Sequence, residues 1–267
     1  MLIPGQERIP RKAHIQAYPV HEVDDMVWVW LGDPAKADPS RIVRYPWHGQ
    51  PDEWPNRRAL LRVHANSLLL VDNLMDLTHL AYLHASTVGS GNADDHVTAE
   101  TELDIREDGL KFTRWMMGST PASTYGSVSE FAGAVDRWQE LDLRTPGCIV
   151  QYSGSKDAGT GAREGRREGG LEIRIIHGIT PETEDSCLYF FSISTRYNPR
   201  KPDAIESLFK GVSIALDEDK EMLEGQAARL KQFGDDDHLV AITSDAARLQ
   251  VKKIMERLAN RGGLVAS

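Results

Sequence analysis

Four side chains of metal-binding or proton-exchanging types lie close together in the chain: Asn73, Asp76, His79 and His84. The sequence around them favours a helix over residues 72 to 85. At 100° per residue, the four side chains then fall within a sector of roughly 140°. A helix face in water normally carries Lys, Glu and Arg, whereas Asp, Asn and His bind metal ions or exchange protons. The segment therefore suggests a metal site, with a solvent-exposed polar face as the alternative.

The spacing of the two histidines sets a geometric condition on that site. His79 and His84 are five residues apart, which on a straight helix splays the imidazoles by roughly 140°. Both rings can reach one metal ion only if the helix bends or contains an irregular turn. Such turns are common at functional sites.

A second helix, expected over residues 202 to 233, supplies a third candidate ligand. Apolar residues lie along one face of this helix, at Val212, Leu216, Leu223 and Leu230. With the two positions between them, 219 and 226, they follow alternating steps of four and three residues, as expected for a core-facing helix. Asp219 and Gln226 occupy the two intermediate positions of the stripe. The neighbouring acids are expected to point away from it: Asp217, Glu218, Glu221 and Glu224.

A carboxylate on a buried stripe must be paired, protonated or bound to a cation, because an isolated buried charge is too costly. Two His and one Asp that leave coordination positions open form the facial triad of non-haem Fe(II) oxygenases. His79, His84 and Asp219 are therefore the candidate ligands. A buried ion pair, or a helix that is only partly covered, is the alternative.

The elements around these helices favour an α+β fold with an antiparallel sheet, since strand runs are separated from helix runs. A strand over 60–71 is expected to lead into the histidine-bearing helix, and a last helix is expected to start near Ser244, a good N-cap. A Pro-rich loop is expected at 33–58, and a mobile surface loop at 154–170. The other expected strands are 14–20, 26–31, a hairpin across 97–117, and the pair 171–178 and 186–194 around a turn at 180–185.

Composition narrows the class of protein. Lys and Arg number 31 against 40 Asp and Glu, so the formal net charge is −9, which gives no footprint for nucleic acid or an anionic membrane surface. The longest apolar runs fall far short of the roughly 20 residues of a membrane span, and no secretory signal is visible. Cys148 and Cys187 are the only cysteines, too few for a disulfide scaffold or a cysteine-based metal site. The sequence predicts a cytoplasmic, globular protein.

Several motifs in order resemble Rieske non-haem iron oxygenase α subunits, in particular the branch of vanillate O-demethylase and dicamba monooxygenase. The metal-site match is Asp72-Asn73-Leu74-Met75-Asp76-x-x-His79-x-x-x-x-His84. Further matches begin at Pro19-Val20-x-Glu22, Trp28-Val29-Trp30-x-Gly32-Asp33-Pro34, Thr180-Pro181-Glu182-Thr183-Glu184 and Glu218-Asp219-Lys220. The resemblance covers nearly the whole chain, and several motifs together are more specific than any one alone.

This resemblance implies a role for each candidate. His79, His84 and Asp219 would hold a mononuclear Fe(II), and Asp76 would link one subunit's iron site to the Rieske centre of its neighbour. Asn73 would lie close to the metal without binding it firmly. The implied fold is a helix-grip domain, a curved antiparallel sheet around a long C-terminal helix, assembled into a head-to-tail homotrimer.

The resemblance also points to a substrate pocket. His177 matches a family position that faces the pocket, although a lone histidine on a strand is more often a structural hydrogen-bonding group. Gln151 and Trp138 are weaker candidates, because the register of their strands cannot be read from the sequence.

The implied reaction is an O2-dependent monooxygenation, often an O-demethylation, of an aromatic, carboxylate-bearing substrate. Electrons would come from a ferredoxin and reductase or from a Rieske-bearing chain. Two other classes remain open: a non-enzymatic helix-grip protein that binds an apolar ligand, and a pseudo-oxygenase subunit in a mixed oligomer. A binding protein has no need for an Asp on an apolar stripe opposite two His.

One departure from the family pattern concerns the [2Fe–2S] cluster. A Rieske cluster needs a Cys-x-His and a Cys-x-x-His pair, and this sequence contains neither. Residues 1–45 are interpreted as the C-terminal remnant of a Rieske domain and residues 46–267 as the catalytic domain. The sequence thus predicts a truncated fragment, a misplaced start codon or a degraded gene. The alternative is a partner chain that supplies the cluster. In either case we expect no turnover by this chain alone.

Overall fold

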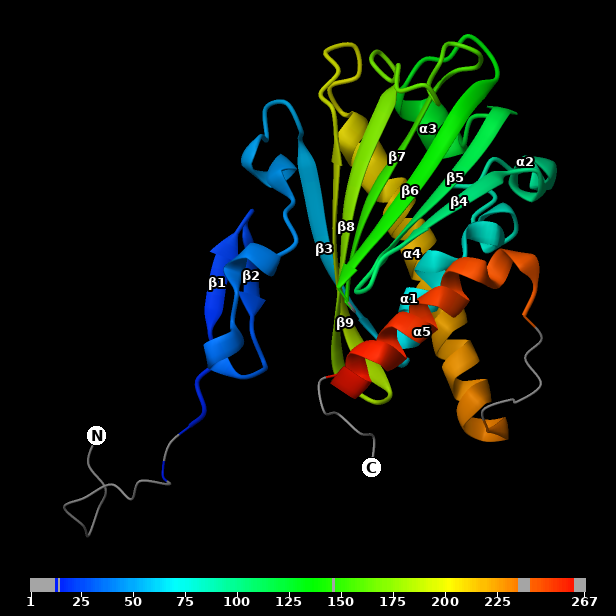
Figure 1. The fold of residues 1–267 in the computed structure, drawn as a ribbon. Coiled ribbons are helices and arrows are strands. Elements are labelled where there is room, and N and C mark those ends of the chain that lie inside the picture. Colours follow the sequence, from blue (N-terminus) through cyan, green and yellow to red (C-terminus); the bar gives the residue numbers. More distant parts are fainter. Residues whose placement is uncertain (1–12, 14, 146, 235–240, 262–267) are drawn as a thin grey trace. The chain divides into compact units, whose positions relative to one another are not determined.

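The computed structural model describes residues 13, 15–145, 147–234 and 241–261 (Figure 1). Contacts divide the chain into two units, Met1–Gly49 and Gln50–Ser267. The division lies close to the boundary expected between residues 45 and 46.

The smaller unit is built around a β-hairpin. Strands β1 (Val20–Val23) and β2 (Met26–Val29) pair antiparallel, and both turn residues, Asp24 and Asp25, have positive φ angles, as a two-residue hairpin turn requires. The Asp24 carboxylate accepts hydrogen bonds from the Arg44 side chain and the Tyr45 amide. Three short 3-10 helices follow: η1 (Pro34–Lys36), η2 (Pro39–Arg41) and η3 (Pro46–Gly49).

The first strand prediction was wrong in position. Residues 15–19 are not in a strand, His14 lies outside the described residues, and pairing begins only at Val20. Between the two expected strands the turn consists of Asp24 and Asp25 alone, because Glu22 and Val23 still pair with β2.

A seven-stranded antiparallel sheet forms the larger unit, in the order β3-β9-β8-β7-β6-β5-β4. Strands β4 to β9 form an antiparallel meander in sequence order, and β3 pairs with β9, the last of them. The strands are β3 (Asn56–Val63), β4 (Glu100–Ile105), β5 (Leu110–Ser119), β6 (Val135–Thr145), β7 (Cys148–Asp157), β8 (Leu171–Thr183) and β9 (Ser186–Thr195).

The hairpin expected across 97–117 and the pair expected at 171–178 and 186–194 are confirmed as β4–β5 and β8–β9. The turn expected at 180–185 was too long, because β8 continues to Thr183 and β9 begins at Ser186. The strand expected over 60–71 is wrong in both bounds, since β3 runs from Asn56 to Val63 and a helix begins at Ser67. Residues 154–157 belong to β7 rather than to a surface loop.

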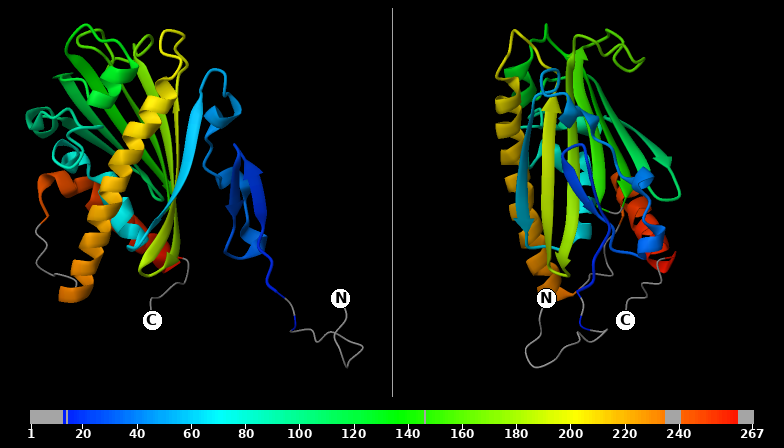
Figure 2. Two further views of the ribbon diagram at one scale, coloured as in Figure 1. Left: turned by 180° about the vertical axis from the view of Figure 1, so that it is seen from behind. Right: turned by 90° about the vertical axis from the view of Figure 1, so that its left-hand side faces the viewer.

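One helix organises the core of the larger unit. Helix α4 (Ala204–Phe233) crosses one face of the sheet (Figure 2) and buries Leu208, Val212, Leu216 and Leu223. The other helices are α1 (Ser67–Met75), η4 (Leu77–Ala81), α2 (Ala93–Val97), α3 (Ser123–Val128), η5 (Thr243–Asp245) and α5 (Ala246–Arg261). Together these elements confirm the expected α+β architecture with an antiparallel sheet and a long C-terminal helix.

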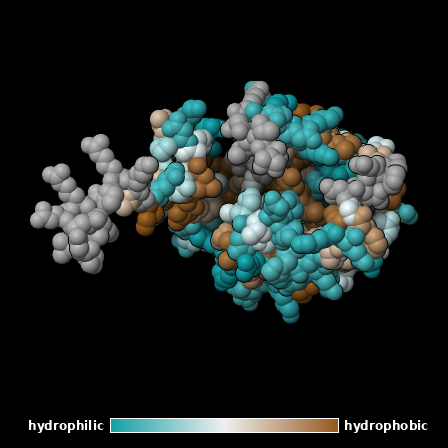
Figure 3. All heavy atoms as spheres, turned by 90° about the horizontal axis from the view of Figure 1, so that it is seen from below, coloured by the Kyte–Doolittle hydropathy of each residue, from teal (hydrophilic) through white to brown (hydrophobic). Residues whose placement is uncertain are grey.

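The apolar stripe of α4 is buried only over part of its length. Leu230 is half-buried and Gln226 is exposed, because the last turns of the helix extend beyond the sheet (Figure 2). Seen from below, hydrophilic side chains cover most of the surface of the larger unit, with smaller hydrophobic patches between them (Figure 3). Among the described helices, none combines the length and apolarity needed to cross a bilayer.

The packing of α4 against the sheet is tested by removing a fully buried side chain. Leu208 has no exposed surface, so Leu208→Ala is expected to lower the free energy of unfolding by about 2–5 kcal/mol, because it leaves a cavity. Met222→Ala on the same helix is the control, since Met222 is 59% exposed and its loss should change stability by about 0.5 kcal/mol or less. Urea denaturation measures both. Equal effects of the two substitutions would contradict this packing.

Candidate metal centre

The histidine-bearing segment is not one continuous helix, and the break is what positions its side chains. Helix α1 ends at Met75, and Asp76 takes an extended conformation. The Asp76 carboxylate then accepts hydrogen bonds from the amide and hydroxyl of Thr78, at 3.0 and 2.6 Å, and so begins η4. An Asp that bonds to backbone two residues ahead competes with helix propagation. The continuous helix expected over 72–85 was therefore wrong, and the irregular turn that two converging histidines require is present.

His79 lies within η4 and is oriented by the same break. Its Nδ1 lies 2.7 Å from the backbone carbonyl of Asp76. Because a carbonyl only accepts, Nδ1 carries the ring proton and Nε2 is left with a lone pair. That Nε2 lies 3.3 Å from Oδ1 of Asp219.

His84 follows in the turns after η4 and is 2% exposed. Its Nδ1 donates to Oε2 of Glu218 at 2.7 Å, and its Nε2 lies 3.0 Å from Oδ1 of Asp219. The chain then folds back tightly, and the Gly89 amide donates to the His84 carbonyl. A Cβ at Gly89 would lie 2.4 Å from the carbonyl oxygen of Leu80, so only glycine fits this turn.

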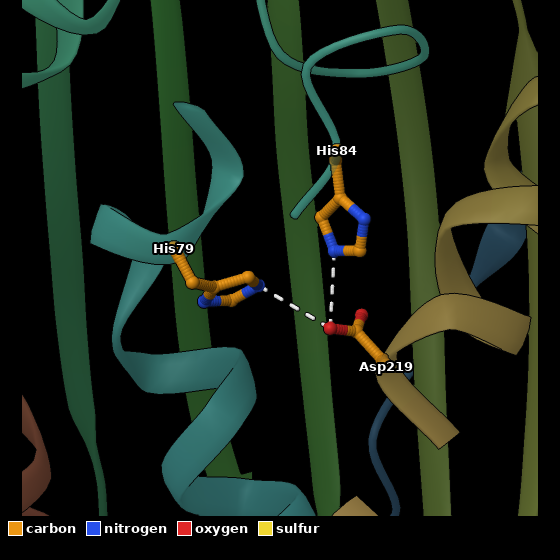
Figure 4. Close-up of side chains that lie close together, drawn as sticks. All are labelled: His79, His84 and Asp219. Atoms are coloured by element: carbon orange, nitrogen blue, oxygen red, sulfur yellow. Dashed lines mark hydrogen bonds and ion pairs between the residues drawn. The ribbon is translucent and has the colours of Figure 1, made fainter. Parts of the chain in front are cut away.

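Asp219 projects from α4 toward both imidazoles (Figure 4). It is 5% exposed, and the Asn73 side chain donates a hydrogen bond of 2.8 Å to its Oδ1. One ligand atom from each of His79, His84 and Asp219 lies within 4.8 Å of the others. The structure thus brings together two residues from one segment and one from a helix far along the chain.

The negative charge of the buried Asp219 carboxylate must be compensated by a positive charge, either a proton or a metal ion. Burial lowers the pKa of His84, but the Asp219 and Glu218 carboxylates outweigh burial and raise it. Burial likewise raises the pKa of Asp219, yet the bonds to His79 and His84 outweigh burial and lower it. With each Nδ1 proton committed elsewhere, two imidazole lone pairs face one carboxylate, and that arrangement repels unless a proton or a metal ion lies between them. The donor set fits a 2-His-1-carboxylate metal site.

A polar network lies on the sheet face that packs against the helices. His177 Nδ1 lies 2.6 Å from the Tyr189 hydroxyl, and its Nε2 lies 3.0 Å from Oε1 of Gln151. The Gln151 amide in turn donates to Ser153 at 2.7 Å. Burial lowers the pKa of His177 to about 3, although Asp219 is near enough to oppose that shift. The imidazole is therefore neutral, and His177 and Gln151 lie on the Asp219 side of the sheet.

Trp138 does not join this network. Side chains alternate between the two faces of a strand, and Leu141 and Leu143 on the same strand belong to the main core. Trp138 instead packs with Trp115 and Ala162 in a separate cluster. The structure therefore contradicts the expectation that Trp138 lines the pocket.

Residues 63–261 match the family model of the vanillate O-demethylase oxygenase C-terminal domain. This chain is a member of the Rieske oxygenase family. The iron-sulfur subunit of the toluene-4-sulfonate monooxygenase system of Comamonas testosteroni is 38% identical over 265 residues, which cover 98% of this chain and 76% of that protein. A vanillate O-demethylase oxygenase subunit of a Pseudomonas species is 30% identical over 257 residues, 94% of this chain and 77% of that protein.

A solved structure supports the same family assignment. The crystal structure of dicamba monooxygenase bound to dicamba has a TM-score of 0.80 at 27% identity and covers 93% of this chain and 71% of that chain. The named activities of these relatives are those of oxygenase components of aromatic monooxygenase and O-demethylase systems, and this Rieske oxygenase family member has the fold of such a component.

Glu218 is the one residue of the site that was not predicted from the sequence. Glu218 was expected to point away from the apolar stripe, yet its carboxylate holds His84 Nδ1. Adjacent residues on a helix are 100° apart, and the Glu side chain is long enough to span that angle to a neighbouring ligand. Asp76 and Asn73 also lie at the site, the first through its backbone carbonyl and the second through its amide.

The contact between Glu218 and His84 predicts the strength of metal binding. Glu218→Ala removes the acceptor that orients the ring, so the affinity for Fe(II) is expected to fall about 10- to 100-fold. Glu221→Ala, an exposed acid on the same helix, should leave the affinity unchanged. Anaerobic titration against a competing chelator measures both variants. Equal affinities would show that Glu218 does not support the ligand.

Proposed function

We propose that this chain is the mononuclear-iron oxygenase component of an aromatic monooxygenase or O-demethylase, with Fe(II) held by His79, His84 and Asp219. The observation that carries the proposal is the convergence of the Nε2 atoms of two imidazoles on one buried carboxylate, with the Nδ1 atom of each ring held by a second oxygen. A non-enzymatic ligand-binding protein has no need for such an arrangement.

The relatives support the choice of metal and reaction. One of the dicamba monooxygenase structures contains non-haem iron and dicamba, with a TM-score of 0.69 at 25% identity; it covers 92% of this chain and 69% of that chain. Fe(II) bound at this triad supplies the activation of O2 for insertion of one oxygen atom into the substrate. The residues of the chain hold the metal, keep the site dry and align the substrate.

His177 and Gln151 are proposed to contact the substrate from the sheet side. Their side chains are joined to each other at 3.0 Å, and burial keeps the imidazole neutral. The amide and imidazole can exchange their mutual bond for bonds to an oxygen-bearing substrate. In a methoxy compound, hydroxylation of the methyl carbon gives a hemiacetal that loses formaldehyde.

The electrons are proposed to come from a Rieske cluster outside these 267 residues. The two cysteines, Cys148 and Cys187, are both buried in the sheet of the larger unit, and neither has a histidine at the spacing of a Rieske motif. Asp76, whose carbonyl holds His79, is proposed as the point where electrons pass from a neighbouring subunit in a homotrimer.

Metal content tests the first part of this proposal. The chain purified anaerobically and supplied with Fe(II) should retain about one iron per chain, and a His79→Ala/His84→Ala variant should retain none, since two of three ligands are gone. Bound iron and the thermal unfolding midpoint are measured on both. A parent chain without iron after reconstitution would overturn the iron site.

The electron source is tested with methoxybenzoates as substrates. The iron-loaded chain is supplied either with NADH and a reductase or with hydrogen peroxide. With NADH and a reductase the iron-loaded chain should release no formaldehyde, because it holds no cluster to relay electrons. Hydrogen peroxide brings the oxygen atom and both electrons together, converting C–H and H2O2 to C–OH and water, so formaldehyde should then appear.

Asp219→Asn should lose the peroxide-driven reaction. Formaldehyde release with NADH and the reductase would show that the chain needs no external cluster. No release with peroxide from an iron-loaded parent would overturn the proposed activity.

A further inference from the structure

Two buried arginines on neighbouring strands face the segment that carries both histidines of the metal centre. Arg114 on β5 is 2% exposed, and Arg137 on β6 is 1% exposed. Arg114 is two and four residues from Phe112 and Leu110, which belong to the main core, and the same even spacing separates Arg137 from the core residue Leu141. Because alternate residues of a strand share a face, both arginine side chains project toward the helices.

Arg114 anchors the start of η4. Its Nη1 donates to the Leu77 carbonyl and its Nη2 to the His96 carbonyl, both at 2.7 Å. Leu77 is the first residue of η4, directly after the break at Asp76, and His79 follows two residues later. The two bonds therefore hold the backbone from which His79 projects, and they join η4 to α2.

Arg137 anchors the turn that follows His84. Its Nη2 donates to the Val88 carbonyl at 3.0 Å. The guanidinium lies over the Tyr125 ring, 5.3 Å from its centroid, and a hydrogen bond joins the two side chains. Val88 precedes Gly89, whose amide donates to the His84 carbonyl. The bond to Val88 thus holds the turn that fixes the backbone of His84.

The segment that receives these bonds, residues 76–97, is called the ligand segment below. It needs support from outside, because residues 82–92 form turns and bends rather than helix or strand. Buried backbone carbonyls without a helix or sheet partner are usually satisfied by side chains. Arginine has five N–H donors in a rigid fork and a permanent charge. Hydrogen bonds from a charged donor are roughly twice as strong as neutral ones.

The charges of the two arginines are costly to bury so close together. Burial, together with the charge of Arg137, lowers the pKa of Arg114 to about 10, while the Asp76 carboxylate opposes that shift. Neither guanidinium forms an ion pair within the described part of the chain. Their three bonds to backbone carbonyls all go to the ligand segment, at Leu77, Val88 and His96.

We propose that Arg114 and Arg137 are positioning residues for the metal centre, one for each histidine. Each acts through a backbone carbonyl, which lies two residues before His79 in one case and four residues after His84 in the other. The inference rests on the proposed function, which supplies the metal ion. A segment anchored in this way is in place before the metal arrives, so less conformational entropy is lost when the metal binds.

The first test uses the full parent chain stripped of metal and needs no variant. Amide hydrogen exchange across residues 77–96 should already be protected, because the arginines hold this segment without metal. Exchange of these amides at the rate of an unfolded chain until metal is added would overturn the proposal.

Metal affinity separates positioning from stability. Fe(II) and Co(II) are titrated anaerobically against a competing chelator, at a temperature where every variant is folded. Arg114→Met and Arg137→Met should each bind both metals about tenfold or more weakly. The visible absorption of bound Co(II), which reports the geometry of its ligands, should also change in both variants.

Leu110→Ala is the matched control, on the same strand and the same face as Arg114. Leu110 has no exposed surface, so its loss should lower the thermal unfolding midpoint by about 5 °C or more. Its apolar side chain cannot bond to a carbonyl of the ligand segment. Metal affinity should therefore change less than about threefold, and the Co(II) absorption should match the parent.

Arg114→Lys is the conservative variant, for use also if Arg114→Met does not fold. An ammonium keeps the charge but lacks the rigid fork that spans two carbonyls, so the metal affinity should lie between those of the parent and Arg114→Met, below the parent by at least about threefold.

Parental metal affinity in the arginine variants, or a loss no larger than that of Leu110→Ala, would overturn the proposal in favour of a purely structural pair. That result would leave the iron site standing. A parent chain that binds neither metal would instead overturn the proposed iron site, and this inference with it.

Discussion

The Asp219 carboxylate is the group on which the rest of this structure depends. It is buried on the core-facing stripe of α4, where an apolar residue would be expected, and two imidazoles and one amide converge on it. A buried carboxylate is tolerated only when its charge is compensated. The break at Asp76, the tight turn at Gly89 and the position of Glu218 all place groups around this one side chain.

The sheet complements the helices by providing a polar face within an otherwise apolar core. Leu141 and Leu143 pack beneath the helices, while Gln151 and His177 on neighbouring strands form hydrogen bonds there. Polar groups on such a face lower stability unless they are bonded. The polar side chains on this face bond to one another, His177 to Tyr189 and Gln151, so the core tolerates them.

The sequence was informative where one residue type stood out against a regular pattern. Asp219 interrupts an apolar stripe, and His79 and His84 follow an Asn and an Asp, so all three could be nominated and the structure brings them together. The long helix and the β4–β5 and β8–β9 pairs also followed from the local pattern of residues, whereas β6 and β7 were not predicted.

Prediction failed where local or tertiary detail decided. The Asp76 to Thr78 hydrogen bonds ended a helix that periodicity would have continued. Trp138 was assigned to the wrong face because a one-residue change in register reverses every side chain of a strand. Glu218 was placed outside the site because helical periodicity does not show how far a long side chain reaches.

The order of the strands has a consequence for how the site forms in time. His84 and Asp219 are 135 residues apart in sequence, and the whole meander from β4 to β9 lies between them. Closing so long a loop is entropically costly and comes late in folding. A metal ion held by all three side chains would therefore stabilise the completed fold rather than its folding transition state. It would slow unfolding far more than it would speed folding, and so raise the kinetic stability of the folded protein.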